Sequence, residues 1–147
     1  MVREVCAELK RLEVEFELTR RGAIRTTIPG RSEGPDRAIV AHLDTLGAIV
    51  SELKADGRLG LVPVGTWSAR FAEGARVSVF TDDNIIRGTI LPLKASGHIF
   101  HEAVDKQPSR WNNLEIRVDE NCRDASELAA LGLRIGDFVG VDAQPEG

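Results

Sequence analysis

The 147-residue sequence contains no tyrosine, two tryptophans and five phenylalanines, so aromatic side chains make up 5% of it. A core built mainly from valine, isoleucine and leucine is therefore expected. An excess of basic residues is also lacking, since the formal net charge is −4 at pH 7. Nucleic-acid-binding domains are usually basic, so nucleic acid is not an expected partner. No apolar run approaches the roughly 20 residues that cross a bilayer, and no membrane partner is expected either.

Cysteine is scarce as well. Cys6 and Cys122 lie far apart in the sequence and belong to different predicted elements. The first residues include acidic side chains where a signal peptide would have a basic start and an apolar stretch. We therefore expect a cytoplasmic protein in which both cysteines are free thiols.

The first third of the chain is typical of the opening of an α/β layer domain. Residues 2–12 carry apolar side chains at helical spacing and predict an amphipathic helix. Residues 13–19 alternate between apolar and acidic side chains, which predicts a half-buried strand, and residues 23–28 predict a second short strand. Residues 37–44 begin with a continuous apolar run, which is consistent with a strand buried on both faces.

The pattern changes after Leu46 and Gly47, where short segments with strand character alternate with turn residues. Regular spacing of this kind indicates a small barrel or sandwich. Asp124, with Glu127 three residues later, predicts the capped start of a short helix. The acidic stretch at residues 82–84 fits a hairpin turn better than a cation site. The predicted strands cover residues 48–53, 59–64, 76–80, 85–91 and 114–118, with a closing strand after Gly136.

A possible metal ligand follows the buried run at residues 37–44. His42 and Asp44 are two residues apart, so both side chains of a strand there start from one face. Neutral imidazole binds zinc or cobalt through one ring nitrogen, and a carboxylate is the usual acceptor for the other N–H. One His-x-Asp motif is a weak signal, because zinc takes three or four protein ligands. The other histidines, His98 and His101, could bind metal as a pair or could lie on a solvated surface.

Residues 41–50, AHLDTLGAIV, resemble the signature of M42 metallo-aminopeptidases of the glutamyl and deblocking type, in which Ala-His-x-Asp, two residues and a glycine end a strand. Within this family, the resemblance extends to a hydrolase encoded with genes for the osmoprotectant N-acetylglutaminylglutamine amide. The order and spacing of the downstream motifs resemble the family's inserted β-barrel, a lid or dimerisation domain of PDZ-like form. These motifs are residues 56–59 (DGRL), 88–98 (GTILPLKASGH), 126–133 (SELAALGL) and 136–139 (GDFV).

The resemblance implies a mixed α/β fold in three parts. Residues 1–45 would form the N-terminal portion of the peptidase catalytic domain, and residues 46–137 the inserted barrel. Residues 138–147 would begin the return to the catalytic domain. The resemblance also implies a homo-oligomer that assembles through the barrel.

For the chemistry, the resemblance implies that His42 binds one metal of a two-metal site and that Asp44 orients His42. The metals, Zn or Co, would activate a water to attack a peptide or small amide substrate. In the family the other ligands and the general base follow the barrel, so we expect this chain alone to be inactive. The alternative is a non-catalytic oligomerisation or binding module formed by the barrel. A carbohydrate hydrolase is disfavoured, because no apposed pair of carboxylates stands out.

Overall fold

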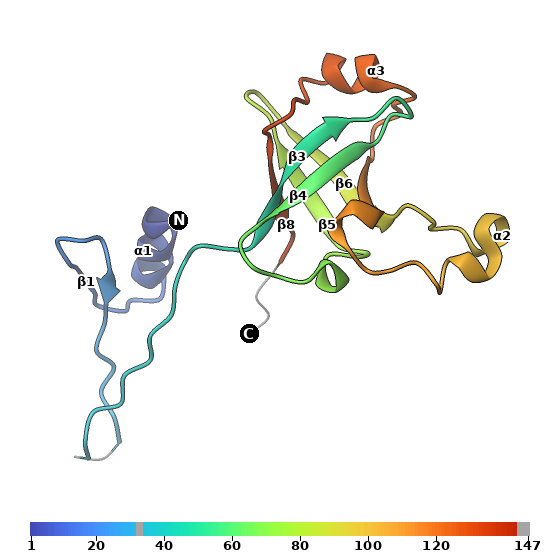
Figure 1. The fold of residues 1–147 in the computed structure, drawn as a ribbon. Helices are drawn as coiled ribbons and strands as arrows, with labels where there is room; N and C mark the ends of the chain where they lie inside the picture. Colours follow the sequence, from blue (N-terminus) through green and yellow to red (C-terminus); the bar gives the residue numbers. More distant parts are fainter. Residues whose placement is uncertain (32–33, 144–147) are drawn as a thin grey trace. The chain divides into compact units, whose positions relative to one another are not determined.

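The computed structural model describes residues 1–31 and 34–143. The chain divides into two compact units, Met1–Thr45 and Leu46–Gly147. Figure 1 shows the first unit in blue and cyan and the second from green to red. None of the helices in the described part of the chain is long and apolar enough to cross a membrane.

The described residues of the first unit form one helix and a two-stranded sheet. Helix α1 (Val2–Arg11) confirms the predicted amphipathic helix, and its last turn carries Lys10 and Arg11, which suit the negative end of the helix dipole. Strands β1 (Glu17–Leu18) and β2 (Ile24–Arg25) pair antiparallel. The two strands predicted over residues 13–19 and 23–28 are thus present but reduced to two residues each. No described residue of this unit is buried, so the unit has no core of its own.

The buried strand predicted over residues 37–44 is wrong for this chain. These residues form no strand, and the side chains of Ile39 and Val40 are 97% and 91% exposed. A strand buried on both faces needs a hydrogen-bonded neighbour and cover on each face. The described residues of the first unit supply neither, so the apolar run stays open to solvent.

The second unit is a closed six-stranded barrel in the order β3-β4-β7-β6-β5-β8. This confirms the mixed α/β fold with a small barrel, and closure leaves no free sheet edge. Figure 1 shows α3 at one end of the barrel and α2 on an arm that projects from it. The strands are β3 (Gly47–Leu53), β4 (Leu59–Val64), β5 (Arg76–Phe80), β6 (Ile85–Pro92), β7 (Leu114–Val118) and β8 (Phe138–Val141). The helices are α2 (Gly97–Phe100), α3 (Ala125–Ala130) and the 3₁₀ turns η1 (Ala69–Phe71), η2 (His101–Ala103) and η3 (Trp111–Asn113).

The closing strand predicted after Gly136 is present as β8, and it carries the barrel past the predicted boundary at residue 137. Strand β8 pairs with both β3 and β5 and so closes the barrel. Its alternation explains this position, because Val139 points into the core while Phe138 points outward. Residues 138–141 therefore belong to the barrel.

The core lies inside the barrel and consists almost entirely of aliphatic side chains. Val50, Leu59, Val77, Ile90 and Ile116 are fully buried, and each comes from a different strand. Helix α3 adds Leu128, which is also fully buried. The helix begins as predicted, because the Asp124 carboxylate accepts hydrogen bonds from the backbone N–H groups of Ser126 and Glu127.

The turn between β3 and β4 requires glycine. Gly57 has φ +76, and a side chain there would meet the carbonyl oxygen of Cys122 at 2.1 Å. Only glycine accommodates both the left-handed backbone and this close approach. The turn brings the ends of the two strands against the segment that precedes α3.

Candidate functional site

His42 and Asp44 contact each other in an exposed, extended segment. The His42 Nδ1 atom lies 2.9 Å from the Asp44 carbonyl oxygen and 3.2 Å from its Oδ1 atom. Both neighbours are acceptors, so the geometry favours a proton on Nδ1 and leaves Nε2 free to accept. The two side chains are 80% and 87% exposed, so Nε2 is open to a ligand.

The described residues offer one imidazole and its carboxylate rather than a complete metal site. Zinc takes three or four protein ligands. Among the residues that the structure describes, no three His, Cys, Asp or Glu side chains gather closely enough to hold a metal ion. A single metal-ligand position fits the arrangement, and a two-metal centre does not.

The second histidine pair lies in the arm of the barrel unit. His98 is in α2, and His101 begins η2 with φ +49. Both residues are exposed. No third His, Cys, Asp or Glu side chain among the described residues joins them in a group that could hold a metal ion, so the structure gives this pair no support as a metal site.

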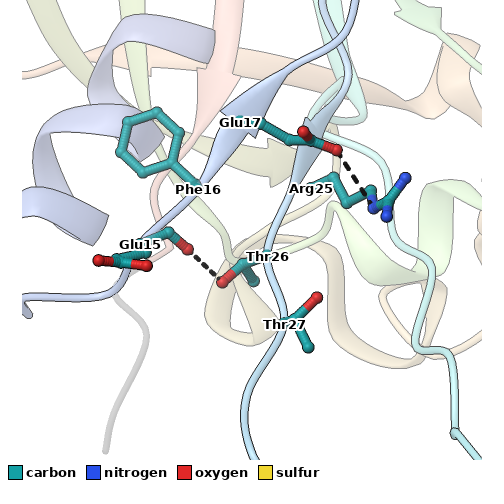
Figure 2. Close-up of a pocket in the computed structure, with 6 residues that line it drawn as sticks. All are labelled: Glu15, Phe16, Glu17, Arg25, Thr26 and Thr27. Atoms are coloured by element: carbon teal, nitrogen blue, oxygen red, sulfur yellow. Dashed lines mark hydrogen bonds and ion pairs between the residues drawn. The ribbon is translucent and has the colours of Figure 1, made fainter.

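A polar groove of about 320 Å³ lies on the two-stranded sheet of the first unit (Figure 2). Within it the Glu17 carboxylate pairs with the Arg25 guanidinium at 3.3 Å. The Thr26 hydroxyl donates to the Glu15 carbonyl at 2.6 Å. The Glu17–Arg25 pair and the Thr26 hydroxyl are thus engaged, and the lining has no thiol or imidazole to start a reaction. The lining residues are Glu15, Phe16, Glu17, Arg25, Thr26 and Thr27.

The cysteines are free thiols, as predicted, and both are partly buried. Burial, and then the nearby Glu127 carboxylate, raises the pKa of the Cys122 thiol. A thiol with a raised pKa carries little thiolate at neutral pH and is a poor nucleophile. Cys122 is therefore a packing residue.

The barrel contains one buried carboxylate that the sequence analysis missed. Glu115 on β7 is 1% exposed and accepts hydrogen bonds from Arg58 at 2.7 Å, Lys54 at 3.1 Å and Arg117 at 3.3 Å. Its alternation with Leu114 and Ile116 predicts an outward side chain. The cover comes from the β3–β4 hairpin, whose long basic side chains fold over the carboxylate. This cluster ties the hairpin to β7 and leaves no free acid for catalysis.

The two tryptophans form a contact between barrel loops. The rings of Trp67 and Trp111 pack edge to face with their centroids 4.7 Å apart. The Trp67 indole N–H donates to the Gly47 carbonyl at 3.1 Å, where β3 begins. The Trp111 indole N–H donates to the Trp67 carbonyl at 3.4 Å. Both rings are therefore structural, with their polar atoms satisfied.

Comparison with known proteins identifies the family to which the chain belongs. The sequence model of the M42 glutamyl aminopeptidase family matches residues 22–147. YhfE of Bacillus subtilis, which is named as an aminopeptidase, is 37% identical over 139 residues, covering 94% of this chain and 40% of that protein. The glutamyl aminopeptidase of Lactococcus lactis is 29% identical, covering 90% of this chain and 37% of that protein.

Solved structures agree in fold. A TET aminopeptidase from a marine sediment thaumarchaeon superposes with a TM-score of 0.63 at 22% identity, covering 95% of this chain and 38% of that one. An aminopeptidase from Desulfurococcus kamchatkensis gives a TM-score of 0.60 at 26% identity, covering 95% of this chain and 37% of that one. The chain thus spans about two fifths of the length of the relatives it matches. Since the family model covers most of its residues, this chain belongs to the M42 glutamyl aminopeptidase family.

Proposed function

We propose that this chain supplies the first part of a metal-dependent aminopeptidase and that His42 is one of its metal ligands. The observation that supports this is the contact between His42 Nδ1 and Asp44 in a chain of the M42 family. With Nδ1–H directed at two oxygens, the imidazole presents Nε2 in the form that binds Zn or Co. Asp44 is then a positioning residue, because it sets the tautomer of His42 and does not itself bind metal.

The substrate would be a peptide or small amide, as the names of the relatives indicate. When bound, a pair of metal ions would supply an activated water and a polarised carbonyl. This chain contributes one imidazole and the carboxylate that fixes its orientation. The remaining ligands and the general base would come from the part of the enzyme that the relatives have and this chain does not span. We therefore propose that the isolated chain does not cleave peptides.

Metal analysis of a full-length relative that carries the same His-x-Asp motif tests the role of His42. Replacement of the motif histidine by alanine should remove metal, measured as bound metal per subunit after dialysis, and abolish hydrolysis of aminoacyl-nitroanilides. Replacement of a histidine in the barrel arm, where this chain has His98, should leave both unchanged. Full metal content in the first variant would contradict the assignment of His42.

The isolated 147-residue chain gives a second test. It should bind zinc or cobalt weakly at best in a calorimetric titration, with the residual binding lost in His42→Ala and kept in His98→Ala. Strong chelator-sensitive cleavage of an aminoacyl-nitroanilide by this chain would show that its residues complete a site, against the proposal.

A second proposed role is self-association through the barrel. The second unit, which contains the barrel, holds every buried residue of the described chain, so it is the part that can present a fixed surface. A fold relative, the Pyrococcus horikoshii TET1 peptidase, can assemble into a tetrahedron or a large octahedral shell. Sedimentation equilibrium of the 147-residue chain should show a concentration-dependent oligomer of defined mass, and a monomer throughout would contradict this role.

A further inference from the structure

The barrel begins at a strand end that is held from three sides. Gly47, the first residue of β3, is buried and pairs with Val64 of β4 and with Gly140 of β8. Its carbonyl also accepts a hydrogen bond from the indole Nε1–H of Trp67 at 3.1 Å. The backbone of Gly47 is therefore fixed by two neighbouring strands and by one side chain from a loop.

The residue before this strand end is held as well. The Leu46 side chain lies against the backbone of Gly65, which follows β4, and a side chain added to Gly65 would meet the Leu46 Cδ2 atom at 2.7 Å. Gly65 has φ +84, so both its left-handed backbone and this close approach require glycine. We call Gly65 and Trp67 the junction clamp, because they hold Leu46 and Gly47.

The indole that holds Gly47 is itself firmly placed. The Trp67 ring is partly buried against the barrel core and packs edge to face on Trp111, with the ring centroids 4.7 Å apart. The Trp111 indole N–H donates to the Trp67 carbonyl at 3.4 Å and so holds the backbone from which the Trp67 ring projects. A donor that is supported in this way can set the position of its acceptor.

The junction clamp lies at the point where the segment with His42 and Asp44 connects to the barrel. The boundary between the two compact units falls between Thr45 and Leu46. Thr45 is thus the only residue of the sequence between Asp44 and the first residue that the junction clamp holds. A fully extended residue spans at most about 3.6 Å, so the Cα atom of His42 lies within roughly 14 Å of that of Leu46.

This short connection is important for a metal ligand. A ligating nitrogen has to be held within about 0.5 Å of its productive position. His42 and Asp44 are exposed and lie outside any helix or strand, so no core around them supplies that order. Each freely rotating residue between the segment and the fixed barrel widens the range of positions that the imidazole explores. The contacts that hold Leu46 remove one such residue.

We propose that Trp67 is a positioning residue for the segment that carries His42 and Asp44. Its indole, together with the bare backbone of Gly65, fixes the point at which this segment joins the barrel. Trp67 acts through the backbone and is not itself a metal ligand, because an indole N–H only donates. The proposal rests on the role of His42 put forward above and adds to it a residue of the barrel.

Backbone ¹⁵N relaxation of the full 147-residue chain tests the proposal with Trp67→Phe, which keeps an aromatic ring and removes the indole N–H. In the wild type, the amide of Leu46 should have the order parameter of rigid backbone, about 0.85, like that of Val77 in the core. In Trp67→Phe the order parameter should fall below about 0.6 at Thr45 and Leu46 and stay unchanged at Val77.

Leu46→Ala perturbs the same junction through the other contact. The Leu46 side chain is 49% exposed, so its truncation removes the packing on Gly65 and leaves the buried core intact. The order parameter of Thr45 should fall in this variant, as it does in Trp67→Phe. Far-UV circular dichroism and the urea midpoint report whether each variant folds, and Leu46→Ala carries the test if Trp67→Phe does not.

Asp124→Ala is the matched control for a loss of stability away from the junction. It removes the N-terminal cap of α3, which lies near the β3–β4 turn and so at the opposite end of β3 from Gly47 (Figure 1). It should lower the urea midpoint, as Trp67→Phe does, and leave the order parameters of Thr45 and Leu46 at their wild-type values. If Trp67→Phe and Leu46→Ala both behaved like this control, the positioning role would be overturned.

The role of His42 is measured separately, as the metal content of the full-length relative. Unchanged order at Leu46 in Trp67→Phe, with metal lost in the motif-histidine variant of the relative, would overturn the positioning role alone. Full metal content in the motif-histidine variant would remove the metal from this segment, and the positioning role would fall with it.

Discussion

Replacement of the buried carboxylate of Glu115 should destabilise the barrel more than any change at an exposed acidic residue. The carboxylate is 1% exposed and is held by three cations, with Arg58 nearest at 2.7 Å. Removal of one partner of a buried ion pair commonly costs about 3–5 kcal/mol of the free energy of unfolding. Here the cations that remain, Lys54, Arg58 and Arg117, keep 23%, 34% and 37% of their side-chain surface in water.

Because these cations can rehydrate, the cost should fall at the lower end of that range. We expect Glu115→Ala to lower the free energy of unfolding by about 3 kcal/mol. For a barrel unit of this size, that is a drop of at least about 10 °C in the melting temperature. Glu115→Gln keeps the shape and loses the charge, so it should cost less, about 2 kcal/mol.

Urea unfolding followed by circular dichroism measures both variants, with Glu120→Gln as the control at an exposed acid. The control should change the free energy of unfolding by less than about 0.5 kcal/mol. If Glu115→Gln behaved like the control, the charged contacts to the hairpin would contribute nothing to stability. That outcome would refute the destabilisation expected from the loss of a buried charge.

Two further changes follow from other contacts. Trp67→Phe keeps the ring and removes the hydrogen bond to the Gly47 carbonyl, so urea unfolding should show a loss of about 0.5–1.5 kcal/mol. The Arg87 guanidinium, through its hydrogen bond, holds the pKa of the Asp142 carboxyl below the ordinary aspartate value of about 3.9. Since the folded-state pKa is the lower one, this stabilisation is present above the unfolded pKa and is lost as the pH falls through the folded pKa. The urea midpoint of the wild type should therefore decrease below about pH 4, and Asp142→Asn should reduce that decrease. An equal decrease in both proteins would contradict the assignment.

The barrel could be predicted because its signals are local. The alternation of Val77 and Val79 with outward side chains identifies β5, and the acidic turn at residues 82–84 separates it from β6. Asp124 predicts the start of α3, because its carboxylate caps the helix by accepting hydrogen bonds from the first backbone N–H groups. Each of these features depends on a few adjacent residues, which a single sequence displays.

Features that depend on distant partners could not be predicted. Alternation places Glu115 on the outer face, and the sequence gives no sign that Lys54 and Arg58, about 60 positions earlier, fold over it. The pairing of Phe80 with Phe138 is hidden for the same reason, because the two residues lie on different strands and become neighbours only through the register. The role of His42 stays a prediction, since it rests on a family motif and on one contact.

The misjudged strand at residues 37–44 shows why a hydrophobic run alone does not determine burial. Ile39 and Val40 have the composition of an interior strand, and they are almost fully exposed. Burial of each such side chain would stabilise the fold by about 2 kcal/mol. This stabilisation is gained only where another surface of the protein packs against the side chain. The barrel meets that requirement within the chain, because six strands close on one another. The first unit does not meet it, because its two strands of two residues each are too short to cover a further strand at residues 37–44. A polypeptide that added strands beside residues 37–44 should bury Ile39 and Val40 and fix the backbone that carries His42, so the same missing contacts would explain both the exposed run and the single metal ligand proposed at His42.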